Sequence, residues 1–181
     1  GFMLGGDKDL VTGERENAWL LSQWHLDLLS RRGAGTGLDL TDTRMEENPN
    51  LGWLKLYHIH DFEPTLDRSG IPRDKVTENR FRAQLRHRLE LGNLITGGNT
   101  YLDADLTYLS DRFYLEDYDP DAFLVEPTPD NILALTHQRG RNLMTLWGRV
   151  RPNSFYQTDT RLPEFALDQI RQPFLNSPLL H

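Results

Sequence analysis

The stretch from Arg80 to Leu91 is the feature that most constrains the fold, because its residues alternate between two kinds. One set of alternate positions is apolar except for one histidine: Phe81, Ala83, Leu85, His87, Leu89 and Leu91. The other set is polar and rich in arginine: Arg80, Arg82, Gln84, Arg86, Arg88 and Glu90. A period of two puts each set on its own face of a β-strand, whereas a helix would spread the arginines around its circumference.

Residues 100–111 repeat this alternation. The apolar face would carry Leu102, Ala104, Leu106 and Tyr108, and the polar face would carry Tyr101, Asp103, Asp105, Thr107 and Asp111. Residues 92–99 between the two segments are rich in turn-forming glycine and asparagine. The pattern predicts an antiparallel hairpin with arginines opposite aspartates, in which each opposite-charge pair contributes roughly 0.2–1 kcal/mol.

Weaker alternation of the same kind predicts six further strands in one segment that spans residues 1–181. All expected strands together cover residues 18–30, 36–42, 51–61, 79–91, 100–111, 131–138, 142–151 and 163–171. The glycine-rich residues 31–37 predict a turn, and the proline-bearing residues 63–74 and 119–130 predict loops. Since no long segment has a helical period, we expect an all-β fold of antiparallel, up-and-down strands.

The length of these strands favours a transmembrane barrel. They run for roughly 8–13 residues, whereas strands of soluble proteins average about 5–6 and membrane-barrel strands need about 9–11. An arginine that faced lipid at mid-membrane would cost about 2–4 kcal/mol, so the arginines must face water or a polar lumen. The expected lumen wall consists of Arg80, Arg82, Arg86, Arg88, Asp103 and Asp105. Alternation alone also permits a soluble barrel with its apolar side inward.

Several aromatic residues lie near the ends of the expected strands. They are Trp19, Trp53, Tyr57, Tyr101, Phe113, Tyr114 and Trp147. Membrane barrels place girdles of aromatic residues at both membrane interfaces. Ordinary core or edge packing is the alternative interpretation.

Charge and composition exclude some classes of protein. The net charge of −7 argues against a general nucleic-acid binder, and the absence of cysteine excludes disulfides and thiolate metal sites from this sequence. No apolar run is long enough for a transmembrane helix, and no signal peptide is recognisable. Because the sequence opens on Gly1 and closes on strand-like residues 177–181, we expect an excerpt from a longer chain.

Few residues suggest chemistry. His58 and His60 share one face of a strand and could bind one metal ion, with His25, His87 or Asp61 as a third ligand. We expect instead two polar side chains on the water-facing side of a strand. Another possible pair, Asp103 and Asp105, could act as acid and base, but we expect these carboxylates to face the arginines.

The remaining patterns predict no enzyme. No serine has a convincing histidine partner, and Gly33, Gly35 and Gly37 precede a strand instead of the helix that a phosphate-binding loop needs. We therefore expect no catalytic residue, no metal and no cofactor. Arginines in a lumen could contact an anionic ligand such as a phosphorylated lipid, or could form a lattice of cross-strand salt bridges.

Residues 108–118 resemble a segment in the barrel domain of the lipopolysaccharide-assembly outer-membrane protein family, LptD, also called organic solvent tolerance protein. In that family a strand runs into a Ser-Asp-x-x-Tyr-Phe-x-Asp-Phe type of loop, which Ser110, Asp111, Asp117 and Tyr118 match here. Further segments match in the same order: Ser30–Gly37, Tyr57–Asp61, Arg86–His87 and Arg161-Leu-Pro-Glu-Phe165, which includes Pro163. The resemblance covers roughly residues 18–170.

The resemblance implies the early part of a large barrel in the cell outer membrane that inserts lipopolysaccharide into the outer leaflet. The partners that it implies are lipopolysaccharide, an LptE-like lipoprotein plug, the periplasmic Lpt bridge and outer-membrane lipid, with no nucleic acid and no enzymatic activity. Two alternatives stay open at this point. One is another outer-membrane porin or transporter barrel, and the other is a soluble β-barrel metal enzyme that uses His58 and His60.

Overall fold

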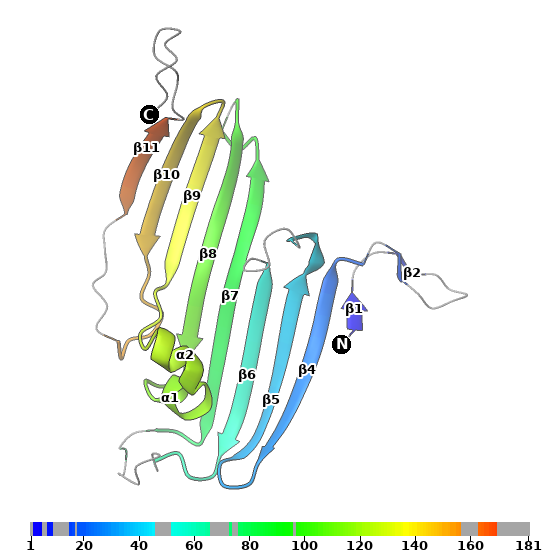
Figure 1. Ribbon diagram of the computed structural model, residues 1–181, viewed down its shortest axis with the longest axis vertical. Coiled ribbons are helices and arrows are strands. Elements are labelled where there is room, and N and C mark those ends of the chain that lie inside the picture. The colour runs from blue at the N-terminus through cyan, green and yellow to red at the C-terminus, as the bar shows by residue number, and fades with distance from the viewer. Residues whose placement is uncertain are drawn as a thin grey trace, which may run out of the picture.

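The fold is a single antiparallel β-sheet whose strands follow one another in chain order (Figure 1). The computed structural model describes residues 2–4, 7–8, 15–16, 18–45, 52–65, 73, 76–95, 97–156 and 163–169. Within these residues the sheet has nine strands, in the order β1-β4-β5-β6-β7-β8-β9-β10-β11, and it does not close on itself. The expected all-β, antiparallel, up-and-down architecture is therefore confirmed.

The strands of the sheet are β1 (Phe2–Leu4), β4 (Leu20–Leu29), β5 (Gly33–Asp42), β6 (Trp53–Asp61), β7 (Asn79–Gly92), β8 (Asn99–Leu109), β9 (Ile132–Arg139), β10 (Asn142–Arg149) and β11 (Glu164–Gln169). A separate two-stranded ladder joins β2 (Asp7–Lys8) to β3 (Arg15–Glu16), and a 3-10 turn, η1 (Thr43–Met45), follows β5. Each of the eight expected strands overlaps one of the strands from β4 to β11.

The connection between β8 and β9 is not the loop that the prolines suggested. It contains two short helices, α1 (Tyr114–Tyr118) and α2 (Pro120–Val125). The side chain of Asp111 accepts a hydrogen bond from the Phe113 amide at 2.9 Å, and that of Asp119 accepts one from the Ala122 amide at 3.2 Å. Pro120 opens α2, where proline has no amide hydrogen to lose. Helices this short show no helical period in the sequence. Asp119 caps α2, whereas the N-cap residue of α1, Phe113, makes no side-chain capping hydrogen bond.

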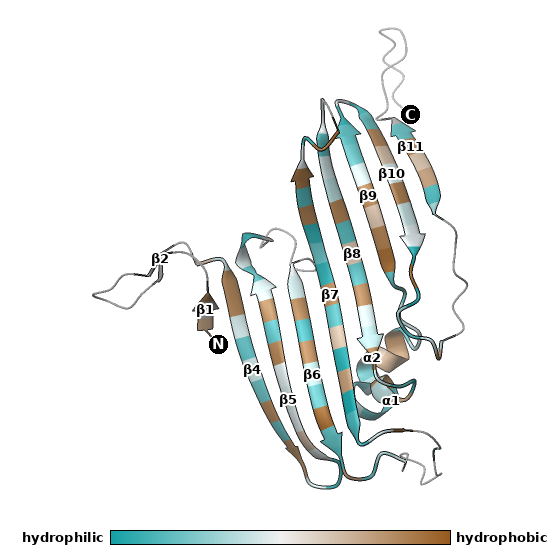
Figure 2. Cartoon of the chain, turned by 180° about the vertical axis from the view of Figure 1, so that it is seen from behind, coloured by the Kyte–Doolittle hydropathy of each residue, from teal (hydrophilic) through white to brown (hydrophobic). Residues whose placement is uncertain are grey.

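The two faces of the sheet differ in chemistry, and we name them from β7. The arginine face carries Arg80, Arg82, Arg86 and Arg88, and the leucine face carries Phe81, Ala83, Leu85 and Leu89. Strand pairing places residues of the same kind side by side on each face. Leu85, for example, stands level with Leu54 of β6 and Leu106 of β8. The colouring in Figure 2 shows this alternation of hydrophilic and hydrophobic residues along the long strands.

The small buried core lies on the arginine face, where α1 packs near β7. Its buried apolar members are Ile59, Leu109, Tyr114 and Leu115, with five partly buried aromatics around them: Tyr57, Tyr118, Phe123, Phe155 and Tyr156. The aromatic-girdle interpretation is wrong for much of its set. Arg86 stacks on Trp53 at 5.6 Å and Arg88 on Tyr101 at 4.2 Å, so these rings belong to the arginine face.

Strand β5 starts at Gly33, three residues before the expected start, because its glycines belong to the strand and not to a turn. Gly35 and Gly37 leave room on the arginine face for the Tyr57 ring, which lies across β5. From there the Tyr57 hydroxyl donates a hydrogen bond to Asp27 of β4 at 2.6 Å. A side chain at either glycine would occupy the space of this ring, which is a recognised reason for glycine inside a strand.

We predict that Gly35→Ala destabilises the folded protein by about 1–3 kcal/mol, because the new methyl group collides with the Tyr57 phenol. The control is Ala34→Val, which adds more bulk at the neighbouring, exposed position on the leucine face and should change stability by no more than about 0.5 kcal/mol. Denaturant unfolding of the protein, followed by tryptophan fluorescence, measures both. Equal effects of the two variants would contradict this role of Gly35.

Candidate functional site

A buried ionic cluster lies at the α1 end of the arginine face and joins several arginines and aspartates of the described residues. At its centre the side chain of Arg80 is fully buried. The Arg80 guanidinium donates to Asp111 at 2.8 and 2.9 Å, to Asp117 at 2.7 Å and to Asp61 at 3.1 Å. Burial of an arginine requires such pairing, because an unpaired charge in this position would cost several kcal/mol.

Asp117 of α1 connects segments that are far apart in the sequence. Its buried carboxylate accepts hydrogen bonds from Arg32 in the β4–β5 turn at 3.3 Å, from Arg73 in the β6–β7 connection at 3.0 Å, and from Arg80 of β7. Arg32 also bonds Asp61 at 3.1 Å. Three arginines thus face three aspartates, so their charges balance. Their ion pairs hold three connections against the same ends of the strands.

The tyrosines of α1 complete the cluster. Tyr118 donates its hydroxyl hydrogen to Asp61, and its ring lies 4.9 Å from the Arg80 guanidinium. Burial raises the pKa of Tyr118, and the hydrogen bond to Asp61 raises it further. Burial likewise raises the pKa of Tyr114, to about 12. Both phenols are therefore neutral at physiological pH and act as hydrogen-bond donors or packing groups, not as bases.

The structure divides the six expected wall residues into two groups. Arg86 pairs with Asp105 at 2.5 Å and Arg88 with Asp103 at 2.7 Å, across β7 and β8, as the complementary polar faces predicted. Arg80 is instead buried in the cluster, and Arg82 pairs with Asp119 before α2 at 2.5 Å. Asp103 and Asp105 face arginines, as expected, and not each other. That this face lines a lumen stays a prediction.

His58 and His60 lie on the leucine face, and the described residues offer them no third ligand. No group of three or more metal-binding side chains occurs in the described part of the chain. His60 instead shares a hydrogen bond of 3.1 Å with Asn79, and its ring contacts Phe62 edge-on. His58 stands level with Phe81. Nothing in this geometry favours the metal-enzyme alternative.

Three of the residues that carry the family resemblance, Ser110, Asp111 and Asp117, lie in the cluster around Arg80. Ser110 donates to Asp111 at 2.7 Å, and Asp111 and Asp117 both bond the Arg80 guanidinium. Pro163 is exposed beside Gly148, whereas Arg161 lies outside the described residues. The segment from Ser110 to Tyr118 is therefore a structural unit, because it folds back as α1 and covers one end of the arginine face.

Sequence reasoning missed several members of the cluster, namely Arg32, Arg73 and Tyr118. It also assigned Asp61 only as a possible metal ligand. One signal was present: the residues after β8 hold Asp111, Asp117 and Asp119, just beyond a strand whose partner carries four arginines. An excess of carboxylates beside an arginine face predicts pairing, but only the fold-back of α1 shows which arginine becomes buried.

The leucine face is the second feature of functional interest, because nothing in the described part of the chain covers it as α1 covers the arginine face. Its exposed large side chains include Trp24, Leu26, Leu28, Leu56, Phe81, Leu89, Tyr108, Met144, Leu146, Phe165 and Leu167. Leu26 and Leu28 are 77% and 80% exposed. An apolar patch that extends over six strands marks a contact with a protein or a membrane.

This apolar band crosses the sheet obliquely. Leu26 of β4 stands level, through Thr36 and His58, with Phe81 of β7. On the far side, Leu146 of β10 stands level, through Leu135 and Leu102, with Leu89 of β7. From β4 to β10 the centre of the band therefore moves along the strands by the distance from Phe81 to Leu89. Figure 1 shows the matching stagger, with the strands stepping upward from β4 to β11.

Comparison with protein-family models, with curated proteins and with solved structures finds no match to this chain. No helix in the described residues is long and apolar enough to cross a membrane.

We predict that Arg80→Met lowers the free energy of unfolding by about 3–5 kcal/mol, because it leaves the buried carboxylates of Asp61 and Asp117 without their central cation. The matched control is Arg88→Met on the same strand and face. Its ion pair with Asp103 is about one-third exposed, so its loss should cost less than about 1 kcal/mol. Denaturant midpoints of the two variants provide the measurement. Similar midpoints would show that the buried cluster contributes no more to stability than the partly exposed ion pair.

Proposed function

We propose that this chain forms part of the wall of an outer-membrane β-barrel that inserts lipopolysaccharide into the outer leaflet. The observation that carries the proposal is the exposed, oblique leucine face on a sheet whose opposite face holds the charges. A soluble single sheet would be expected to cover its apolar face. Here the helices lie on the charged face instead, which fits a wall with lipid on one side and a polar interior on the other.

The slope of the apolar band supports strands that are tilted in a membrane. Eight residues separate Phe81 from Leu89, and six strand-to-strand steps separate β4 from β10. At 3.3 Å per residue and 4.8 Å per strand, the band is inclined by roughly 40° to the perpendicular of the strands. Strands of membrane barrels tilt by about 35–45°, so this band would lie level in the plane of a bilayer.

The height of the band agrees with the same geometry. On β7 the leucine face runs from Phe81 to Leu91, with His87 as its one polar member. This is roughly 33 Å along the strand, which a tilt of roughly 40° reduces to roughly 25 Å of height. The apolar belt of an outer-membrane barrel is about 25 Å tall.

The arginine face supports a polar interior stabilised by its own ion pairs. The sequence left open whether the arginines form a salt-bridge lattice or bind an anionic ligand. The pairs Arg86–Asp105 and Arg88–Asp103 favour the lattice. The cluster around Arg80 adds helices that fold over the interior at one end. A lipoprotein plug of the LptE kind and the periplasmic Lpt bridge belong to the proposal through the family resemblance.

Lipopolysaccharide as the cargo rests on that same resemblance. Its support is that the matching residues Ser110, Asp111, Asp117 and Tyr118 form one structural unit around Arg80, as a motif that specifies architecture would do. The role is transport without catalysis. Another outer-membrane porin or transporter shares the barrel but not the cargo, so the cargo needs its own experiment.

The connections suggest an orientation. At the α1 end they comprise residues 30–32, 62–78, 110–131 and 150–163, and at the other end residues 43–52, 93–98 and 140–141. Outer-membrane barrels have short periplasmic turns and longer extracellular loops. The α1 end would therefore face the cell exterior and the β9–β10 turn the periplasm.

We predict that a cysteine at exposed Leu124 in α2 reacts with a membrane-impermeant maleimide on intact cells, whereas one at exposed Arg141 in the β9–β10 turn reacts only after the outer membrane is permeabilised. Both are introduced singly into the full-length protein in its host, in a background without other reactive cysteines. The reverse pattern would invert the orientation, and equal labelling of both before permeabilisation would contradict a membrane-spanning wall.

The proposal as a whole predicts that the full-length protein fractionates with the outer membrane of its host and migrates differently on a gel with and without boiling. Depletion of the protein should then reduce lipopolysaccharide at the cell surface. If the protein is heat-modifiable but its depletion leaves surface lipopolysaccharide unchanged, the barrel proposal stands and lipopolysaccharide is not the cargo. Recovery in the soluble fraction, with no change on boiling, would overturn the membrane barrel.

A further inference from the structure

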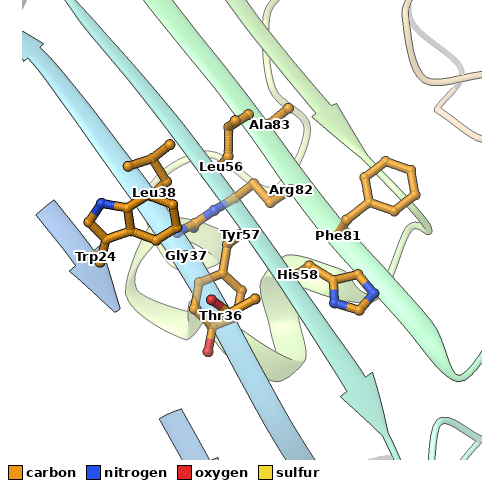
Figure 3. A pocket seen from close by; sticks show the side chains of 10 residues that line it. All are labelled: Trp24, Thr36, Gly37, Leu38, Leu56, Tyr57, His58, Phe81, Arg82 and Ala83. Carbon is orange, nitrogen blue, oxygen red and sulfur yellow. The ribbon is translucent and has the colours of Figure 1, made fainter. Parts of the chain in front are cut away.

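Two hollows meet at Ala83 on the leucine face, and together we call them the Ala83 furrow. The first has a volume of about 300 Å³ and is bordered by Trp24, Leu38, Leu56, His58, Phe81 and Ala83 (Figure 3). The second has a volume of about 390 Å³ and is bordered by Leu54, Ala83, Leu85, Leu106, Tyr108 and the segment 150–152. Ligand sites commonly have roughly 300–1,000 Å³.

The furrow exists because one side chain in a row of large ones is small. Ala83 stands level with Leu56 on β6 and with Tyr108 on β8. Along β7 its neighbours on the same face are Phe81 and Leu85. A single methyl group among four large side chains leaves a depression, and its apolar lining favours a hydrocarbon over water.

One end of the furrow is bounded by a segment that is not a strand and that side-chain hydrogen bonds hold against β8. β9 begins at Ile132, so the backbone of β8 beyond Asp105 has no strand partner on that side. The Asn131 side chain accepts from the Thr107 amide instead, and the Asn153 side chain accepts from the Leu109 amide at 2.9 Å and donates to the Thr107 carbonyl at 2.8 Å. Two asparagines thus hold residues 150–153 against β8.

This held segment places a cation at the furrow. Arg151 borders the second hollow, is exposed, and donates from its guanidinium to the Ser154 carbonyl at 2.9 Å. Among the described residues no carboxylate pairs with it, in contrast to Arg80, Arg82, Arg86, Arg88 and Arg149. An arginine beside an apolar groove is complementary to a molecule with a hydrocarbon chain and an anionic head.

We propose that the Ala83 furrow is a binding site for one membrane lipid, which lays an acyl chain over Ala83 and places a head group of net negative charge at Arg151. The inference rests on the proposed function, because the leucine face must contact the bilayer. It goes beyond that function, because general lipid contact requires no selected lipid. Arg151 lies at the α1 end, where β10 gives way to a connection, which is the level expected for head groups.

The test uses the full-length protein purified from host membranes and exchanged into detergent with either phosphatidylglycerol or phosphatidylcholine. Native mass spectrometry then counts the lipids that stay bound. We expect one retained phosphatidylglycerol per protein, preferred over phosphatidylcholine by about tenfold, as one charge-assisted contact would give. Inorganic phosphate added alone should not displace the lipid, because the acyl chain contributes to binding.

Variants separate the chain from the head group. Ala83→Phe fills the furrow and should abolish retention of both lipids. Ala104→Phe is its control, because Ala104 is also small and on the leucine face but borders neither hollow. Arg151→Gln should remove the preference for phosphatidylglycerol and keep retention, whereas Arg141→Gln in the β9–β10 turn should change nothing.

Several outcomes would overturn the site. Equal retention in Ala83→Phe and Ala104→Phe would show that the furrow does not bind the lipid. An unchanged preference in Arg151→Gln would show that Arg151 does not contact the head group. Binding of inorganic phosphate to wild type and Ala83→Phe alike, without lipid retention, would reduce the site to an anion site. Heat-modifiable migration is recorded for every protein, and Ala83→Leu replaces Ala83→Phe should the latter lose it. A wild type that lacks it refutes the proposed function, whereas a heat-modifiable wild type without selective retention refutes this inference alone.

Discussion

Register is the constraint on which this structure depends. Because side chains alternate across a strand and the pairing of β4 to β11 keeps them in step, a residue on β4 stands on the same face as its level partners six strands away. A slip of one residue in either ladder of β7 would bring its arginines among the leucines of the neighbouring strands. The two faces are therefore continuous across the whole sheet, one charged and one apolar.

The charged face is stabilised locally, and the apolar face is left for another contact. Three arginines pair with three aspartates in the cluster around Arg80, and α1 adds aromatic side chains that help to bury them. This arrangement holds the longer connections against the ends of the strands. The helices cover charged side chains and not the leucine face. The apolar surface of the leucine face therefore stays exposed within the described residues, and its burial by another contact would be favourable.

Small residues adapt both faces to their neighbours. Gly35 and Gly37 on the arginine face admit the Tyr57 ring, which reaches β4 across β5, whereas Ala83 on the leucine face leaves a furrow that no side chain fills. The difference is that the first gap has an occupant within the chain. The second lies on the exposed leucine face, and the occupant that we propose for it is a lipid.

The sequence by itself determined the strands, their antiparallel order and the composition of the two faces, because these depend on a local period of two and on turn formers. It also placed arginines opposite aspartates on neighbouring strands, because the polar faces of the two alternating segments are complementary. It could not show that Arg80 is buried, that residues 114–125 are helical, or that glycines 33–37 continue a strand. Those features depend on contacts between Arg32, Asp61, Arg73 and Asp117, and between Gly35 and Tyr57, which are distant in the chain. Only the tertiary structure brings them together, because burial and ion pairing are properties of the assembled sheet and not of any one strand.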